Sequence, residues 1–175
     1  MSATPIRPAP LIGIAGYKNV GKTTLVERLV SELVTRGLKI ATIKHAHHSV
    51  EVDEPGRDSH RHRMAGAEQV AVVSSVRWAV MTELRGQAEP TLDEVIASLA
   101  PADLIIVEGY KTHDFPKIEV RREGVTRRKM FGDVPNVIAV ASDTLFETGL
   151  TALDLDDIPT IADFVLAHFD IRLHE

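Results

Sequence analysis

The 175-residue sequence contains no cysteine, which removes several kinds of chemistry at once. Disulfide bonds, thiolate metal sites and cysteine nucleophiles are all excluded. The longest aliphatic run, at 104–107, is far too short to cross a bilayer. Residues 1–10 contain three prolines and no apolar core, so they do not resemble a secretory signal, and we expect a disordered tail there. These features favour a cytoplasmic protein that does not bind membranes.

Aromatic residues and net positive charge are also scarce. Aromatics make up 5% of the chain and the net charge is −5, which together disfavour nucleic-acid binding. The segment 111–129 departs from this acidic average, although acidic residues interrupt it. Either a solvated face or a phosphate-contacting surface explains it. Its basic residues are Lys111, Lys117, Arg121, Arg122, Arg127, Arg128 and Lys129.

The apolar pattern near the start of the chain predicts a βαβ unit. Residues 11–15 form a short apolar segment that is typical of a buried strand. Between 25 and 34, leucines and valines each recur every four residues, which predicts one apolar stripe on a helix. Gly37 is placed to end that helix, and 39–44 is the next expected strand. Strand, helix and strand in this order predict a parallel sheet.

Further along, two strand-like runs separated by a Ser-Ser turn predict a β-hairpin over 69–84. Thr91 and Glu94 have the spacing of a capping box and mark the start of a helix. A polar segment at 45–63 leads into the next short helix. The other expected elements are helices at 58–65, 91–100 and 158–169, and strands at 103–107, 117–121 and 136–141.

The motif with the clearest chemistry is G-x-x-x-x-G-K-T at 16–23, between the first strand and the first helix. Its glycines let backbone N–H groups close around a phosphate, and the helix start adds its positive dipole end. We expect Lys22 to act catalytically by reaching the β- and γ-phosphates, Thr23 to ligate Mg²⁺ and Thr24 to face the α-phosphate. The predicted phosphate-binding residues are Gly16, Tyr17, Lys18, Asn19, Val20, Gly21, Lys22, Thr23 and Thr24.

This motif defines the expected fold class. We predict an α/β P-loop NTPase fold, with a mostly parallel sheet flanked by helices and a β-hairpin extension, in a single nucleotide-binding domain over 11–175. Such a protein needs a second Mg²⁺ ligand at the end of a neighbouring parallel strand. Glu108 follows four aliphatic residues and precedes Gly109, which allows close backbone approach. We therefore predict Thr23 and Glu108 as the metal ligands, and we expect Asp103 to form a turn or cap.

The polar segment 45–63 is where residues around the γ-phosphate would lie. Asp53 and Asp58 are the candidates for orienting Mg²⁺-bound or attacking water, and arginines at 57, 61 and 63 could neutralise phosphate charge. Five of the eight histidines also fall here. His47 and His48 could instead join Asp53 in a metal site, so a metallochaperone remains an alternative.

Two further residues stand out. Asp143 directly follows a predicted strand, and in guanine-specific P-loop proteins an aspartate in that region accepts hydrogen bonds from the base. We predict a base contact there, although the chain has no N-K-x-D stretch. Trp78 is the only tryptophan. Core packing or an oligomer contact is favoured over base stacking for it.

Several of these segments resemble the molybdopterin-guanine dinucleotide biosynthesis protein B (MobB) family. The most specific are the loop at 16–24, the stretch I-K-H-A-H-H at 43–48 and the stretch D-E-P-G-R-D-S at 53–59. The resemblance covers residues 10–170 and extends to 65–67, 77–83, 104–111 and 137–143.

The resemblance implies a cytoplasmic GTP-binding adapter with Mg²⁺ and weak GTPase activity. It would act on molybdopterin beside the nucleotidyltransferase, protein A of the same pathway, that joins GMP to it. The family is similar to the metallochaperone and dethiobiotin-synthetase branch of P-loop proteins and forms homodimers partly through an extended hairpin, here 69–84. Lys18 is one place away from the signature lysine of that branch, so its side chain is not assigned that role. Residues 121–132 match only loosely and receive no role. An ATP-dependent small-molecule kinase or ligase is a third alternative.

Overall fold

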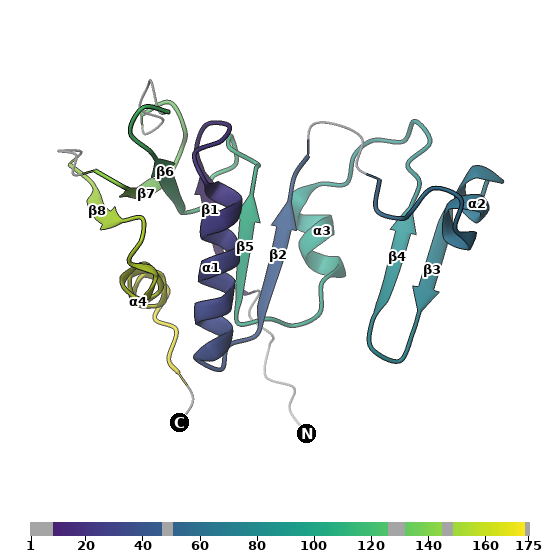
Figure 1. Ribbon diagram of the computed structural model, residues 1–175, viewed down its shortest axis with the longest axis horizontal. Coiled ribbons are helices and arrows are strands. Elements are labelled where there is room, and N and C mark those ends of the chain that lie inside the picture. The colour runs from purple at the N-terminus through teal and green to yellow at the C-terminus, as the bar shows by residue number, and fades with distance from the viewer. Residues whose placement is uncertain (1–8, 47–50, 126–131, 145–148, 174–175) are drawn as a thin grey trace. The chain divides into compact units, whose positions relative to one another are not determined.

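The computed structural model describes residues 9–46, 51–125, 132–144 and 149–173 (Figure 1). These residues gather in two compact units, which we call the first unit (up to His45, and from Ala100 onward) and the second unit (Ala46–Leu99). Residues 1–8 of the tail predicted at 1–10 lie outside the described residues, whereas the Pro10 carbonyl oxygen accepts the Ile105 N–H at 2.9 Å. The interpretation of 11–175 as a single domain stays a prediction, to which the structure adds this division.

The first unit is built on a six-stranded sheet in the order β2-β5-β1-β6-β7-β8. All neighbouring strands in it run parallel, as the βαβ pattern predicts. β1 is central, with β5 on one side and β6 on the other. The strands are β1 (Leu11–Ala15), β2 (Ile40–Lys44), β5 (Leu104–Glu108), β6 (Lys117–Arg121), β7 (Val137–Ser142) and β8 (Thr151–Asp154).

Two helices pack on one face of this sheet, and buried side chains of the helices and the strands form the core. These are α1 (Lys22–Thr35) and α4 (Ile158–His168), which contact each other (Figure 1). Alternate strand residues, such as Ile12 and Ile14 of β1, join the buried leucines of α1 in one cluster. The α/β fold with a mostly parallel sheet flanked by helices is thereby confirmed.

The predicted apolar stripe of α1 is correct for its leucines and only partly correct for its valines. Leu25, Leu29 and Leu33 are buried, whereas Val34 is 53% exposed. A helix has 3.6 residues per turn, so residues spaced by four drift around the axis by about 40° per step, and the last valine leaves the buried face. Gly37, with φ of +90°, ends the helix as predicted.

The second unit contains two short helices and a hairpin. Its elements are α2 (Asp58–Met64), β3 (Gln69–Val73), β4 (Trp78–Thr82) and α3 (Leu92–Ser98). β3 and β4 pair antiparallel, which confirms the predicted hairpin. α3 begins at the predicted capping box, because the Thr91 side chain accepts the Glu94 N–H and the Glu94 carboxylate accepts the Thr91 N–H.

One strand, β8, has no counterpart in the sequence prediction. It is only four residues long, and Leu153 is its single large apolar residue and its one buried position. A four-residue edge strand with one apolar side chain leaves no periodic signal.

The contrast within α1 generates a stability prediction. We expect Leu29→Ala to lower the free energy of unfolding by about 2–5 kcal/mol, because it empties a buried position in a close-packed core. The matched control is Val34→Ala on the exposed side of the same helix, with an expected change within about 0.5 kcal/mol. Urea unfolding followed by circular dichroism measures both. Equal losses for the two variants would contradict this assignment of the buried face.

Candidate functional site

The loop between β1 and α1 lies at the carboxyl edge of the sheet and is packed tightly at its start. A Cβ atom placed on Gly16 would lie 2.8 Å from the Val120 carbonyl oxygen and 2.9 Å from a Val20 methyl group. Both distances are shorter than real Cβ contacts allow, so glycine is required there. The first glycine of the motif therefore holds the loop against β6, the strand next to β1.

The loop then turns directly into α1. Asn19 and Gly21 have positive φ angles of 66° and 96°, and Gly21 is the N-cap of the helix. No side chain caps α1, and no acidic residue lies in its first turn. The first N–H groups of a helix lack partners within the helix, and the dipole makes this end positive. The loop is therefore built to receive an anion.

Cationic side chains reinforce this property. Lys22 Nζ donates a hydrogen bond to the Tyr17 carbonyl oxygen at 2.7 Å, across the loop. Burial lowers the pKa of Lys22, Glu108 opposes this shift, and the charges of Lys111 and Lys44 lower the pKa further. The charges of Lys44 and Lys111 therefore disfavour the ammonium form of Lys22, and a bound anion would offset this repulsion.

The two predicted metal ligands face each other. Glu108 ends β5, where it is in register with Ile14 of β1. The Thr23 hydroxyl lies 3.4 and 3.5 Å from the two Glu108 carboxylate oxygens. Lys44 Nζ is 3.8 Å from the same carboxylate. A hydroxyl and a carboxylate are the hard oxygen ligands that Mg²⁺ takes beside nucleotide phosphates, so these residues fit the ion.

Gly109 permits the close approach that the sequence predicts. A Cβ atom on Gly109 would lie 2.6 Å from His45 Cβ, and His45 N–H donates to the Glu108 carbonyl oxygen at 2.8 Å. The ends of β2 and β5 are therefore in direct contact beside the carboxylate. Tyr110 follows with a positive φ of 47° and stacks on the His45 ring, with centroids 4.4 Å apart. At the other end of β5, Asp103 accepts the Lys39 N–H, as expected of a cap.

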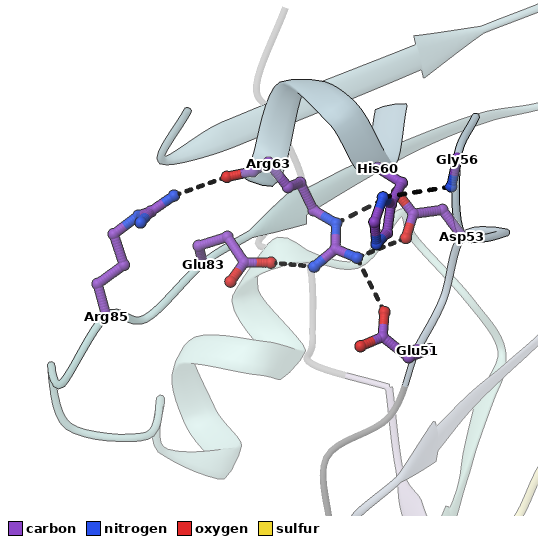
Figure 2. A network of polar contacts seen from close by, with 7 residues as sticks. All are labelled: Glu51, Asp53, Gly56, His60, Arg63, Glu83 and Arg85. Carbon is purple, nitrogen blue, oxygen red and sulfur yellow. Dashed lines mark hydrogen bonds and ion pairs between the residues drawn. The ribbon is translucent and has the colours of Figure 1, made fainter. Parts of the chain in front are cut away.

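The two predicted water-orienting aspartates belong to the second unit. Asp53 Oδ1 lies 2.6 Å from Arg63 Nη2, and Arg63 also pairs with Glu51 and Glu83 (Figure 2). Arg63 is the main cause of the lowered pKa of Asp53. Asp58 is the first residue of α2. The structure thus gives Asp53 an ion-pairing role, and the catalytic roles of both aspartates stay predictions.

The alternative metal site also stays untested. His47 and His48 lie outside the described residues. Among the residues that the structure describes, no three histidine, aspartate or glutamate side chains gather as a metal site would require. In the same part of the chain, no helix is long and apolar enough to span a bilayer.

The basic segment 111–129 does not form one surface. Lys117 is fully buried in β6 and donates to the carbonyl oxygens of His113, Phe115 and Pro135. Arg121 is also buried. Residues 127–129 lie outside the described residues. The solvated-face interpretation is therefore wrong for Lys117 and Arg121, because both belong to β6 and are buried.

Trp78 is 72% exposed on the hairpin, so the core-packing interpretation is wrong for it. The oligomer-contact interpretation stays open. Several other apolar side chains of the hairpin are also exposed, namely Val72, Val73, Val76 and Val80. α2 contacts β3, but these side chains still lie on the surface of the two-stranded sheet.

Asp143 follows β7, and its carboxylate has protein partners. Oδ1 accepts the Glu123 N–H at 2.8 Å, and Oδ2 lies 3.9 Å from Arg122 Nη1. Its contact with a base stays a prediction. Arg122, which the sequence placed in the basic segment 111–129 without singling it out, approaches the phosphate loop: its Nη2 would lie 3.6 Å from a Cβ placed on Gly21. Its position directly after a predicted strand is the signal that could have identified it.

Comparison with known proteins gives consistent results. The family model described as molybdopterin guanine dinucleotide synthesis protein B, MobB, matches residues 11–143. The chain is 41% identical to the Haemophilus influenzae molybdopterin-guanine dinucleotide biosynthesis adapter protein, over 91% of both chains. It is 40% identical to the Escherichia coli protein of the same name, over 90% of this chain and 91% of that one.

A solved structure of a molybdopterin-guanine biosynthesis protein B has a TM-score of 0.73 and 25% identity, covering 90% of this chain and 99% of that chain. The fold of the MobB protein homologue from Bacillus stearothermophilus is similar as well, with a TM-score of 0.69.

The paired carboxylate of Asp53 generates a pH prediction. Its pKa is lowered in the folded state, so the pairing stabilises the fold above the ordinary aspartate pKa of about 4, and this stabilisation is lost as the pH falls through the lowered value. We expect Asp53→Asn to melt below the wild type at pH 7 and pH 5, with the difference shrinking toward pH 3.

Thermal unfolding at the three pH values measures this effect. The control is Glu54→Gln, which removes an exposed ion pair with Arg57 and should change the melting temperature little at any pH. A gap between Asp53→Asn and wild type that stays constant from pH 7 to pH 3 would show that the carboxylate charge is not the cause.

Proposed function

The chain belongs to the MobB family and is an adapter protein of molybdopterin-guanine dinucleotide biosynthesis, and we propose that it does this work by binding GTP with Mg²⁺ in the loop at 16–24. The observation that carries the proposal is the complete phosphate cradle at the carboxyl edge of the central strand. There an uncapped helix start, Lys22 and the facing pair Thr23 and Glu108 come together.

The chemistry of this cradle suits a triphosphate. Backbone N–H groups of the loop would surround the phosphate oxygens, and Lys22 would neutralise charge on the β- and γ-phosphates. Thr23 and Glu108 would hold Mg²⁺, which would neutralise charge on the phosphates. The preference for guanine follows from the family, whose members are named for a guanine dinucleotide.

Hydrolysis of GTP by this chain should be slow. Fast hydrolysis needs a residue that orients the attacking water. The predicted candidate for that role, Asp53, is instead paired with Arg63. We therefore propose that nucleotide binding, with weak turnover, serves the adapter role. Its partners would be molybdopterin and the nucleotidyltransferase that attaches GMP to it, in the cytoplasm.

A second copy of the chain is a further proposed partner. The hairpin presents Val73, Val76 and Trp78 to solvent, each more than two thirds exposed. Exposed apolar groups of this kind favour association, and a two-stranded sheet also offers free strand edges. We propose that a homodimer forms through this hairpin.

Titration calorimetry with Mg²⁺ and either GTP or ATP tests nucleotide binding. We expect wild type to bind GTP at submillimolar levels and more tightly than ATP, and Lys22→Ala to abolish binding because it removes the cation of the cradle. Lys39→Ala is the matched control, because this exposed lysine precedes β2 at the opposite edge of the sheet, and it should bind like wild type. If wild type fails to bind GTP at millimolar concentration, the proposal falls. If Lys22→Ala binds normally, the phosphate site lies elsewhere.

Sedimentation velocity tests the homodimer. We expect wild type to sediment as a dimer and Trp78→Glu to shift it toward monomer, because a charge would have to be buried in an apolar contact. Val34→Glu, which alters another exposed apolar residue in the first unit, should leave the dimer intact. A monomeric wild type, or an unchanged Trp78→Glu dimer, would reject the hairpin as the interface.

A further inference from the structure

We propose that Arg122 is a ligand for the phosphate chain, supplied by the same polypeptide, and that Asp143 is its positioning residue. The inference rests on the proposed function, which it deepens by adding a cation on the β6 side of the loop. For the basic segment 111–129 the sequence left a solvated face and a phosphate-contacting surface open, and this inference assigns phosphate contact to Arg122.

Strand order brings Arg122 to the loop. β6 pairs directly with β1, with Ala15 opposite Glu119. Arg122 is the first residue after β6, at the same edge of the sheet where β1 passes into the loop. The tight contact between Gly16 and the Val120 carbonyl oxygen locks these two segments together. The backbone that carries Arg122 is therefore held beside the loop.

The guanidinium group lies beside the end of the loop, where α1 begins. Its Nη2 would lie 3.6 Å from a Cβ placed on Gly21, the residue directly before Lys22. The Arg122 side chain is 44% exposed, so an incoming ligand can contact it. Glu108 belongs to β5 and Arg122 follows β6, so the metal ligand and this arginine approach the loop from strands on opposite sides of β1.

Asp143 orients this side chain from the next strand. β7 pairs with β6, with Ser142 opposite Arg121, so the residues after both strands are neighbours. Asp143 Oδ2 lies 3.9 Å from Arg122 Nη1, while its Oδ1 accepts the N–H of Glu123. One terminal nitrogen of Arg122 thus faces the aspartate, and the other faces the loop.

This arrangement suits phosphate. A planar guanidinium donates paired hydrogen bonds to two phosphate oxygens, which an ammonium group cannot do. The ligand class is therefore the phosphate chain of a nucleotide, and inorganic pyrophosphate shares that chemistry. The geometry also gives Asp143 a role different from the base contact that its position in the sequence predicts.

The two roles for Asp143 make different predictions for base selectivity. A positioning aspartate acts through Arg122, so its loss should weaken pyrophosphate and GTP together and leave the GTP:ATP affinity ratio unchanged. An aspartate that contacts guanine should alter that ratio and leave pyrophosphate affinity unchanged.

The experiment is calorimetry of the full chain with Mg²⁺ and GTP, GDP, ATP or pyrophosphate. We expect Arg122→Gln to weaken GTP, GDP and pyrophosphate about tenfold or more, because a charge-assisted contact is lost. Arg122→Lys should restore only part of the affinity. The matched control is Arg172→Gln, which removes another exposed Arg–Asp pair with the same 3.9 Å separation and should bind like wild type.

Asp143→Asn keeps an oxygen for the Glu123 N–H but loses the charge that faces Arg122. It should weaken pyrophosphate severalfold, keep the GTP:ATP ratio, and add nothing in the double variant with Arg122→Gln. A changed ratio with unchanged pyrophosphate affinity would overturn the positioning role. Melting temperatures of all variants identify any that fail to fold.

The outcomes separate this inference from the proposed function. If wild type binds GTP, Lys22→Ala does not, and Arg122→Gln binds like wild type, only the inference falls. If wild type binds pyrophosphate but not GTP and Arg122→Gln weakens it, the inference stands without the GTP proposal. If wild type binds neither ligand, both fall.

Discussion

Backbone contacts that only glycine can make hold the carboxyl edge of the sheet together. Gly16 lies against the end of β6, and Gly109 lies against the end of β2, each so closely that a Cβ would collide with its neighbour. These two contacts tie β1 to β6 and join β2 to β5 beside the Glu108 carboxylate. An anion cradle needs its donors in place before the ligand arrives, because ordering them during binding costs affinity. The nucleotide-binding site proposed at this edge therefore depends on the rigidity of the edge.

Elements with strong local signals could be predicted from the sequence. The capping box at Thr91 and the helix-ending Gly37 each depend on neighbours a few residues away, so their chemistry is visible along the chain. Long apolar runs likewise indicated the inner strands. β8 was missed because Leu153 is its only large apolar residue. Val34 was misplaced because a four-residue spacing only approximates the helical repeat.

The same distinction applies to the candidate site: its local motif could be predicted, whereas contacts set by tertiary packing could not. The motif predicted the loop, and the rule that ligands lie at strand ends predicted the approach of Glu108 to Thr23. The pairing of Asp53 with Arg63 and the burial of Lys117 depend on tertiary packing, which no local pattern encodes. Arg122 could not be singled out within the basic segment 111–129, because the sequence orders the strands along the chain without giving their order across the sheet.

The place of the second unit in the chain has a consequence for how such proteins vary. β2 and β5 are adjacent and parallel, so the chain leaving one must return to the opposite edge of the sheet before it enters the other. Here that obligatory return is the whole second unit, Ala46–Leu99. A return path of a dozen residues suffices for parallel strands. The rest of the second unit is not needed to connect β2 to β5. The hairpin can therefore change in length or in surface residues while β2 and β5 keep their register.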